Sequence, residues 1–167
     1  MKNILLFLFF VNLCSCVLIE EENFSFDLQP YYGNNLNTKG YYKLINGEYS
    51  KIENNNDTSI LFFYNNGIVF FSSVSDLTDE TRLNKGRGIY YNWGIYKVEN
   101  DSVYIQNKFN PGEFHTYVYT RVANIENDTT IHFCYTKSNY IGYLNTNHTY
   151  VFVKYISKPD STNRYIK

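Results

Sequence analysis

The sequence has few of the residues that make disulfide scaffolds, metal sites or membrane-spanning helices. Among 167 residues there are three cysteines, three histidines, three prolines and one methionine. The cysteines and histidines are scattered and lack the spacing of zinc ligands. The longest unbroken apolar run covers residues 4–11, which is far short of the roughly 20 residues that a helix needs to cross a bilayer. These absences argue against a disulfide-stapled fold, a structural metal and a helix that spans a membrane.

Charge and catalytic motifs are equally sparse. The net charge is −1, and lysine and arginine form no cluster of the kind that contacts nucleic acid or an anionic lipid surface. The sequence has no Gly-x-Ser-x-Gly nucleophile turn and no glycine loop for phosphate. We therefore expect no nucleic-acid partner, no cofactor and no enzymatic activity.

The histidines and one cysteine are the remaining candidates for reactive chemistry. His115, His132 and His148 fall on three different predicted strands, which a barrel could bring together, although isolated histidines are far more usual. Cys134 also lies in a predicted strand, where a free cysteine usually acts as a small buried hydrophobe. We expect neither a metal site nor a cysteine nucleophile.

The start of the chain is typical of an exported protein. Lys2 precedes the apolar run at residues 4–11, and small residues follow it, which is the order of a secretory signal. The segment Leu13-Cys14-Ser15-Cys16 resembles the bacterial lipobox, which has an aliphatic residue three places before the modified cysteine and a small one directly before it. Cys14 is a less common occupant of the middle position.

The lipobox resemblance implies cleavage between Ser15 and Cys16 and attachment of acyl chains, such as palmitate, to Cys16. Two or more chains hold a protein stably on a membrane. Residues 1–15 are therefore predicted to be a signal peptide. The expected location is the cell envelope, on the outer membrane, facing either the periplasm or the outside. Cys134 would then have no partner for an intramolecular disulfide.

Residues 16–38 are predicted to form the lipidated N-terminus and a flexible tether, because they are rich in asparagine, glycine and other polar residues. The acidic run Glu20-Glu21-Glu22 resembles the surface-export signal of Bacteroidota lipoproteins, although it begins a few residues later than that signal usually does. The alternative is a solvated charge cluster within a linker.

Aromatic residues are plentiful at 19%, which favours strands over helices. Turn signals such as Asn46-Gly47, Asn65-Asn66-Gly67, Asn100-Asp101 and Asn127-Asp128 separate short apolar stretches and predict hairpins in series. The expected strands are residues 40–45, 48–52, 59–64, 68–72, 89–99, 102–108, 116–125, 129–136 and 149–156. Residues 61–63 and 69–71 do not alternate between apolar and polar, so both of their faces are expected to be buried or half-buried.

The predicted fold is all-β, an antiparallel up-and-down meander of about eight to nine strands over residues 39–158. Closure into a barrel is favoured because it hides the sheet edges, and an open β-sandwich is the alternative. One turn of helix is expected over residues 77–83, capped by Ser75 or Asp76. Pro159 ends the last strand, and residues 159–167 are predicted to be a polar tail.

Several short motifs resemble those of lipocalin-like lipoproteins of Bacteroidota. They are Gly40-Tyr41-Tyr42, Leu61-Phe62-Phe63-Tyr64-Asn65-Asn66-Gly67, Trp93-Gly94-Ile95-Tyr96 and Lys158-Pro159-Asp160-Ser161-Thr162-Asn163. The resemblance extends from about residue 40 to the end and implies a small barrel; the function of the family is largely undefined. The Gly-x-Trp motif of true lipocalins belongs at the first strand, whereas Trp93-Gly94 is in mid-chain.

The expected function is a membrane-anchored binding module for a small hydrophobic ligand. Tyr91, Trp93 and Tyr96 are the candidate ligand wall, and ordinary packing of the barrel is the alternative for these rings. A barrel of this size is either just filled by side chains or holds one small ligand. A filled barrel would instead be an interaction protein that docks onto another envelope protein. Ser102, Thr129 and Ser161 follow aspartate in a pattern that resembles the O-glycosylation motif of exported Bacteroidota proteins.

Overall fold

The computed structural model describes residues 20–47, 58–112 and 115–166. The strands are β1 (Glu20–Glu21), β2 (Gly40–Asn46), β3 (Ser59–Phe63), β4 (Ile68–Ser73), β5 (Trp93–Glu99), β6 (Ser102–Phe109), β7 (His115–Asn127), β8 (Thr130–Ser138) and β9 (Gly142–Lys154). The helices are η1 (Ser75–Thr78), α3 (Glu80–Arg87) and η2 (Tyr90–Asn92). Within the described ranges, no helix is long and apolar enough to span a membrane.

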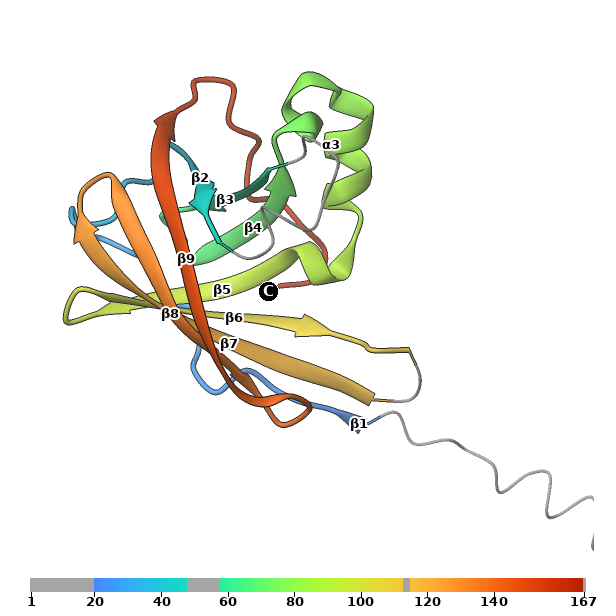
Figure 1. Ribbon diagram of the computed structural model, residues 1–167. Coiled ribbons are helices and arrows are strands. Elements are labelled where there is room, and N and C mark those ends of the chain that lie inside the picture. Colours follow the sequence, from blue (N-terminus) through green and yellow to red (C-terminus); the bar gives the residue numbers. More distant parts are fainter. Residues whose placement is uncertain (1–19, 48–57, 113–114, 167) are drawn as a thin grey trace, which may run out of the picture.

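Eight antiparallel strands, β2 to β9, close into a barrel (Figure 1). Consecutive strands pair with each other from β2 to β9, and β9 pairs with β2 to complete the ring. The predicted all-β meander and its closure are therefore confirmed, and the open sandwich is not formed. β1 pairs in parallel with the first residues of β7, outside this ring.

Local turn chemistry explains two of the hairpins. Asn100 and Asp101 have φ angles of 48° and 59°, which is the left-handed pair that a type I′ turn requires. Gly67 has a φ of 82°, and a Cβ atom there would lie 2.1 Å from the carbonyl oxygen of Gln29, so only glycine fits. The predicted strand at residues 48–52 lies outside the described residues, and β2 pairs with β3 and β9.

Side chains on the two faces of the barrel wall form two hydrophobic clusters. The interior cluster comprises Leu36, Tyr42, Leu44, Leu61, Phe63, Val69, Tyr96, Val103, Ile105, Ala123, Ile131, Phe133 and Tyr150. The outer cluster comprises Ile60, Phe62, Tyr64, Ile68, Phe70 and Trp93, covered by side chains of η1, α3 and the C-terminal residues. Strands β3 and β4 contribute to both clusters, which confirms the prediction that residues 61–63 and 69–71 are largely buried on both faces.

The predicted helical turn at residues 77–83 is divided into η1 and α3. Asp79 lies between them in an extended conformation, with φ −136° and ψ 101°, and its carboxylate accepts hydrogen bonds from the backbone N–H groups of Thr81 and Arg82. The cap of α3 is therefore Asp79, whereas the sequence favoured Ser75 or Asp76. Leu77 and Leu83 pack onto the outer cluster.

Residues 20–38 lie against the barrel, and we call them the strap. The strap begins at β1 beside β7, and the ammonium of Lys97 lies 5.1 Å from the centre of the Phe26 ring. Its second half crosses one end of the barrel, where Tyr31 donates its backbone N–H to Asn65 and Leu36 enters the interior cluster. A flexible tether was predicted for residues 16–38, but from residue 20 onward polar contacts fix the segment to the barrel.

The residues after β9 are also attached to the barrel. The guanidinium of Arg87 on α3 lies 2.9 Å from the carboxylate of Asp160, and Tyr165 and Ile166 pack onto the outer cluster. Lys158 donates hydrogen bonds to the carbonyl oxygens of Thr38 and Phe63. The C-terminal segment, which was predicted to be a polar tail, therefore covers one side of the barrel.

Candidate functional site

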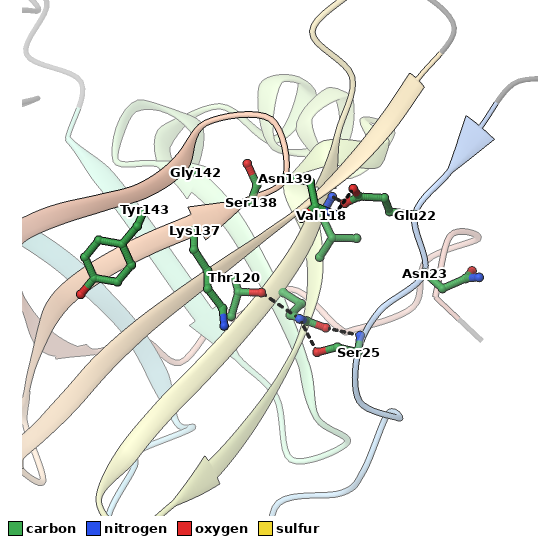
Figure 2. Close-up of a pocket in the computed structure, with 11 residues that line it drawn as sticks. Glu22, Asn23, Ser25, Val118, Thr120, Lys137, Ser138, Asn139, Gly142 and Tyr143 are labelled. Carbon is green, nitrogen blue, oxygen red and sulfur yellow. Dashed lines mark hydrogen bonds between the residues drawn. The ribbon is translucent and has the colours of Figure 1, made fainter.

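The candidate site is an open groove on the outside of the barrel, between the strap and the β8–β9 hairpin (Figure 2). Its volume is about 560 Å³, which suits a small molecule. We call it the strap groove. Its lining residues are Glu22, Asn23, Ser25, Gln106, Val118, Thr120, Lys137, Ser138, Asn139, Gly142 and Tyr143.

Strand register places the floor and one wall of the groove. Gln106 on β6 is opposite Thr120 on β7, and Thr120 is in turn opposite Lys137 on β8. Lys137 is opposite Tyr143 on β9. Because directly opposed residues in an antiparallel sheet point to the same face, these four side chains form a row across the outside of the barrel.

Gln106 fixes the strap above this row. Its side-chain oxygen accepts a hydrogen bond of 2.8 Å from the backbone N–H of Ser25. Its amide nitrogen donates to the hydroxyl oxygens of Ser25 and Thr120, each at 2.8 Å. Both amide protons are thus used within the protein, and the buried Gln106 holds the strap rather than a ligand.

Glu22 joins three elements at the end of the groove. One carboxylate oxygen accepts the backbone N–H of Val118 at 2.7 Å, and the other accepts the side-chain amide of Asn139 at 2.7 Å. The Val118 N–H lies beyond the β7–β8 ladder, which ends at the Thr120–Lys137 pair, so the carboxylate replaces a strand as its acceptor. Glu22 therefore ties the strap to β7 and to the β8–β9 turn.

Glu21 anchors the start of the strap. The Lys108 ammonium donates a hydrogen bond to its carboxylate, and so does the Tyr90 hydroxyl at 3.0 Å. These hydrogen bonds, first that from Lys108, lower the pKa of the Glu21 carboxyl below its ordinary value. Two of the three acidic residues in the run 20–22 are thus bonded to the barrel, unlike a solvated cluster in a linker.

The groups left to face a ligand are an ammonium, amides, hydroxyls and one aromatic ring. In the described part of the chain, Lys137 forms no ion pair, and its side chain borders the groove beside Tyr143 (Figure 2). The Tyr143 ring is exposed and stacks on Tyr135, with 4.9 Å between ring centres. Asn23 on the strap and Ser138 on β8 border the groove from opposite sides, and the Asn23 side chain points away from the strands (Figure 2). Such a surface can hydrogen-bond several hydroxyls while a ring covers an apolar face of the ligand.

The prediction that Tyr91, Trp93 and Tyr96 form one ligand-binding wall is wrong, because the three rings do not share a surface. Trp93 and Tyr96 are each 1% exposed and belong to different clusters, because residues an odd number apart on a strand point to opposite faces. The Trp93 indole N–H donates to the carbonyl of Arg87, and the Tyr96 hydroxyl donates to the carbonyl of Tyr64. Tyr91 is the only exposed ring of the three. Packing, the alternative, accounts for Trp93 and Tyr96.

The three histidines do not converge. His132 is paired with Asn124 of β7, nine residues along that strand from His115, a separation of about 30 Å at 3.3 Å per residue. His148 is paired with Phe133, so it points to the other face of the sheet from His132. Among the described residues, no group of three or more potential metal ligands is found. Cys134 is a free, half-buried thiol in the same strand as His132.

The remaining predicted sites are separate from the groove. Ser102 donates to the side-chain oxygen of Asn124, Thr129 is exposed in the β7–β8 turn, and the Ser161 hydroxyl accepts a hydrogen bond from Asn66. Thr129 is the most exposed of the three, although its hydroxyl also donates a hydrogen bond of 2.7 Å to the side-chain oxygen of Asn127. Ser15 and Cys16 lie outside the described residues.

Sequence reasoning did not identify the groove. Its residues come from the strap and from four strands, and their types are common on any protein surface. One signal was present: Gln106 shares a strand face with Tyr104, at a central position where an amide must find partners if it is buried. The partner, Ser25, is 81 residues away, and no local pattern indicates it.

The chain was compared with known protein families, curated proteins and solved structures. No protein-family model, curated protein or solved structure matches the chain. The structural finding is therefore a closed antiparallel β-barrel, consistent with a lipocalin-like barrel, that carries a polar groove beneath its N-terminal strap.

Proposed function

We propose that this chain is a lipid-anchored protein of the cell envelope and a non-enzymatic binding module, with the strap groove as its ligand site. The ligand class is a small polyhydroxylated molecule such as a sugar. The observation that carries the proposal is the combination of an exposed Tyr143 ring with amide, hydroxyl and ammonium groups in a groove of about 560 Å³.

The groove is a better ligand site than the barrel interior. The rings of Tyr42 and Phe63 pack edge to face with centres 5.5 Å apart, and those of Phe63 and Tyr96 with centres 4.9 Å apart. These residues are essentially inaccessible to solvent. A hydrophobic ligand inside the barrel would have to displace them, at a cost of several kcal/mol for each large side chain removed from the core.

The groove is also preorganised. Gln106 and Glu22 hold the strap wall, and the β7–β8–β9 ladder holds the opposite wall. A site built in this way loses little conformational entropy when a ligand binds. The chemistry needs no reactive residue, which supports a binding module over an enzyme.

Titration with a panel of monosaccharides and disaccharides, followed by backbone amide NMR, tests the ligand class. We expect saturable shifts at residues 23–25, 120, 137–139 and 143 for at least one sugar. Tyr143→Ala should weaken binding about 2- to 10-fold, since aromatic contacts contribute about 0.5–1.5 kcal/mol. Lys137→Met should weaken it less, because a neutral sugar offers the ammonium only hydrogen bonds.

Tyr32→Ala is the matched control, because Tyr32 is 91% exposed and does not line the groove. It should leave the dissociation constant unchanged. Shifts confined to residues of the barrel interior, or no shifts with any sugar, would refute the groove as a sugar site.

The packed interior also favours a second function, in which the barrel is a rigid body that docks onto another envelope protein. Chemical cross-linking in intact cells, followed by mass spectrometry, distinguishes the two. A docking protein should yield one dominant cross-linked partner whether or not sugar is present. A sugar-binding module should yield no cross-linked protein partner whose capture depends on the groove residues.

A further inference from the structure

The turn between β8 and β9 exposes an unusual concentration of apolar side chains. We call residues 138–144 the hairpin tip. Four of its seven residues are large and hydrophobic, namely Tyr140, Ile141, Tyr143 and Leu144, and they are 39% to 63% exposed. An exposed apolar group of this kind commonly marks a surface that contacts a membrane or another protein.

The tip contains no aspartate, glutamate, lysine or arginine. It is supported from behind, because the Tyr140 ring lies 5.7 Å from that of Phe109 and 5.2 Å from that of Tyr117, measured between ring centres. The tip can therefore enter an apolar environment without burying a formal charge and without losing its shape.

The tip lies at the end of the molecule where the described chain begins. Asn139 donates a hydrogen bond of 2.7 Å to Glu22, and β1 pairs with the first residues of β7, next to Tyr117. Figure 1 shows β1 beside the β8–β9 turn. Cys16 precedes Glu20 by four residues, which span at most about 14 Å even when fully extended.

We propose that the hairpin tip docks into the interfacial region of the phospholipid bilayer. This inference rests on the proposed lipid anchor at Cys16, because acyl chains within about 14 Å of Glu20 bring this end of the barrel to the membrane. Tyr140 and Tyr143 each combine an apolar ring with a hydroxyl, the combination that is enriched at membrane–water interfaces. Ile141 and Leu144 supply the apolar contact with the acyl chains.

Docking would fix how the protein stands on the membrane. Tyr143 and Asn139 belong to both the tip and the groove, so the groove would open close to the lipid headgroups. Ile156, in contrast, follows the other end of β9, about 40 Å from Gly142 along a strand with 3.3 Å per residue.

A pair of tryptophan reporters tests this arrangement. The full chain carrying Ile141→Trp, the tip reporter, or the matched Ile156→Trp, the distal reporter, is purified after export and mixed with phosphatidylcholine vesicles that contain brominated acyl chains. Emission from Trp93 is subtracted by means of the wild-type chain, in which that ring is buried. We expect bromine to quench the tip reporter strongly and to leave the distal reporter unchanged, although Ile156 is the more exposed position at 93%.

Equal quenching of both reporters, or quenching of neither, would overturn the docking proposal. Shielding of the tip reporter on adding a second copy of the chain or a soluble envelope extract, but not on adding vesicles, would assign the tip to a protein partner. A double variant, Ile141→Ser with Leu144→Ser, should abolish the contact of the hairpin tip with the bilayer, leaving the acyl chains as the attachment, while the sugar titration stays unchanged, because neither residue lines the groove. Failure of the anchor is recorded separately by the mass of the mature chain at Cys16.

Discussion

Lys158 is a largely buried cation whose partners are neutral. Its ammonium donates to the carbonyl oxygens of Thr38 and Phe63 and lies 4.1 Å from the centre of the Tyr64 ring. Burial lowers the pKa of Lys158 from 10.5 to about 8, because the charged form loses hydration that the two carbonyls only partly replace. One side chain thus fastens the start of the C-terminal segment to the end of the strap and to β3.

This pKa predicts that stability rises with pH over part of the alkaline range. Between about pH 8 and 10.5 the unfolded chain keeps a proton on Lys158 that the folded chain has lost, so the unfolding free energy increases with pH. We expect a gain of about 1–2 kcal/mol between pH 8 and 9.5, after allowance for the solvent that reaches the site. Chemical denaturation at a series of pH values measures it.

Buried tyrosines limit this gain. Burial raises the pKa of Tyr42 from 10.0 to about 12, so above about pH 10 an unfolded tyrosine loses a proton that folded Tyr42 keeps, and stability falls. The control is Lys158→Met, which should remove the rise between pH 8 and 9.5 and retain the loss above pH 10. An identical rise in the variant and the wild type would show that Lys158 is not its source.

At the scale of elements, the first part of the strap is held by a few polar contacts, whereas Leu28, Tyr31 and Leu36 further along it pack on the hydrophobic clusters. Gln106→Leu removes the three hydrogen bonds that join Ser25, Gln106 and Thr120. We expect the amide of Ser25 to exchange with solvent much faster and the unfolding free energy to fall by about 1–2 kcal/mol. Hydrogen-exchange mass spectrometry over residues 20–28 measures the first effect and denaturation the second.

Gln29→Leu is the matched control, because Gln29 is an exposed glutamine of the same strap. It should change neither quantity. If Gln106→Leu left exchange across residues 20–28 at the wild-type rate, the strap would be held by something other than Gln106.

The strands were largely predictable from sequence because their signals are local. Short apolar stretches bounded by Asn-containing turns predicted β3, β4, β6, β7 and β8 to within a few residues of their observed ranges. β9 was expected over residues 149–156, but the strand begins at Gly142. The early start was not predictable, because residues 142–148 are mostly exposed, include two asparagines and show no apolar alternation. Backbone pairing with β8 holds this part in a strand, and no side-chain pattern reports it.

The candidate site was not predictable for a related reason. Trp93 and Tyr96 were chosen as candidates because they are large aromatic residues. They are three residues apart on one strand, so their side chains point to opposite faces of the sheet, and each is packed in a different cluster. Glu22 and Ser25 fell in a segment whose composition indicates a tether, and their partners lie 96 and 81 residues away. Contacts of such range arise from the closed barrel and leave no local signal.

At the scale of the whole molecule, the barrel is packed on both sides of one wall. β3 and β4 carry aromatic residues to the interior and also to the outer cluster beneath α3 and the C-terminal residues. The opposite side, where β7, β8 and β9 meet the strap, is polar and hollowed. The hydrophobic stability and the proposed binding surface thus occupy different sides of the same barrel.

The proposed orientation of the barrel on a membrane depends on the lipid anchor at Cys16. If Cys16 carries acyl chains, the hairpin tip and the strap groove both lie near the bilayer, because only three residues separate Cys16 from the strap. The lipobox resemblance is the basis of that prediction, and nothing in the barrel itself depends on it.

The most direct measurement is the intact mass of the mature protein, expressed as the full-length chain in a Bacteroidota host beside a Cys16→Ala variant. We predict a chain that begins at Cys16 and carries the added mass of acyl groups, and the loss of that species in the variant. An unmodified chain that begins elsewhere, with the same mass pattern in the variant apart from the substitution itself, would contradict the lipid anchor.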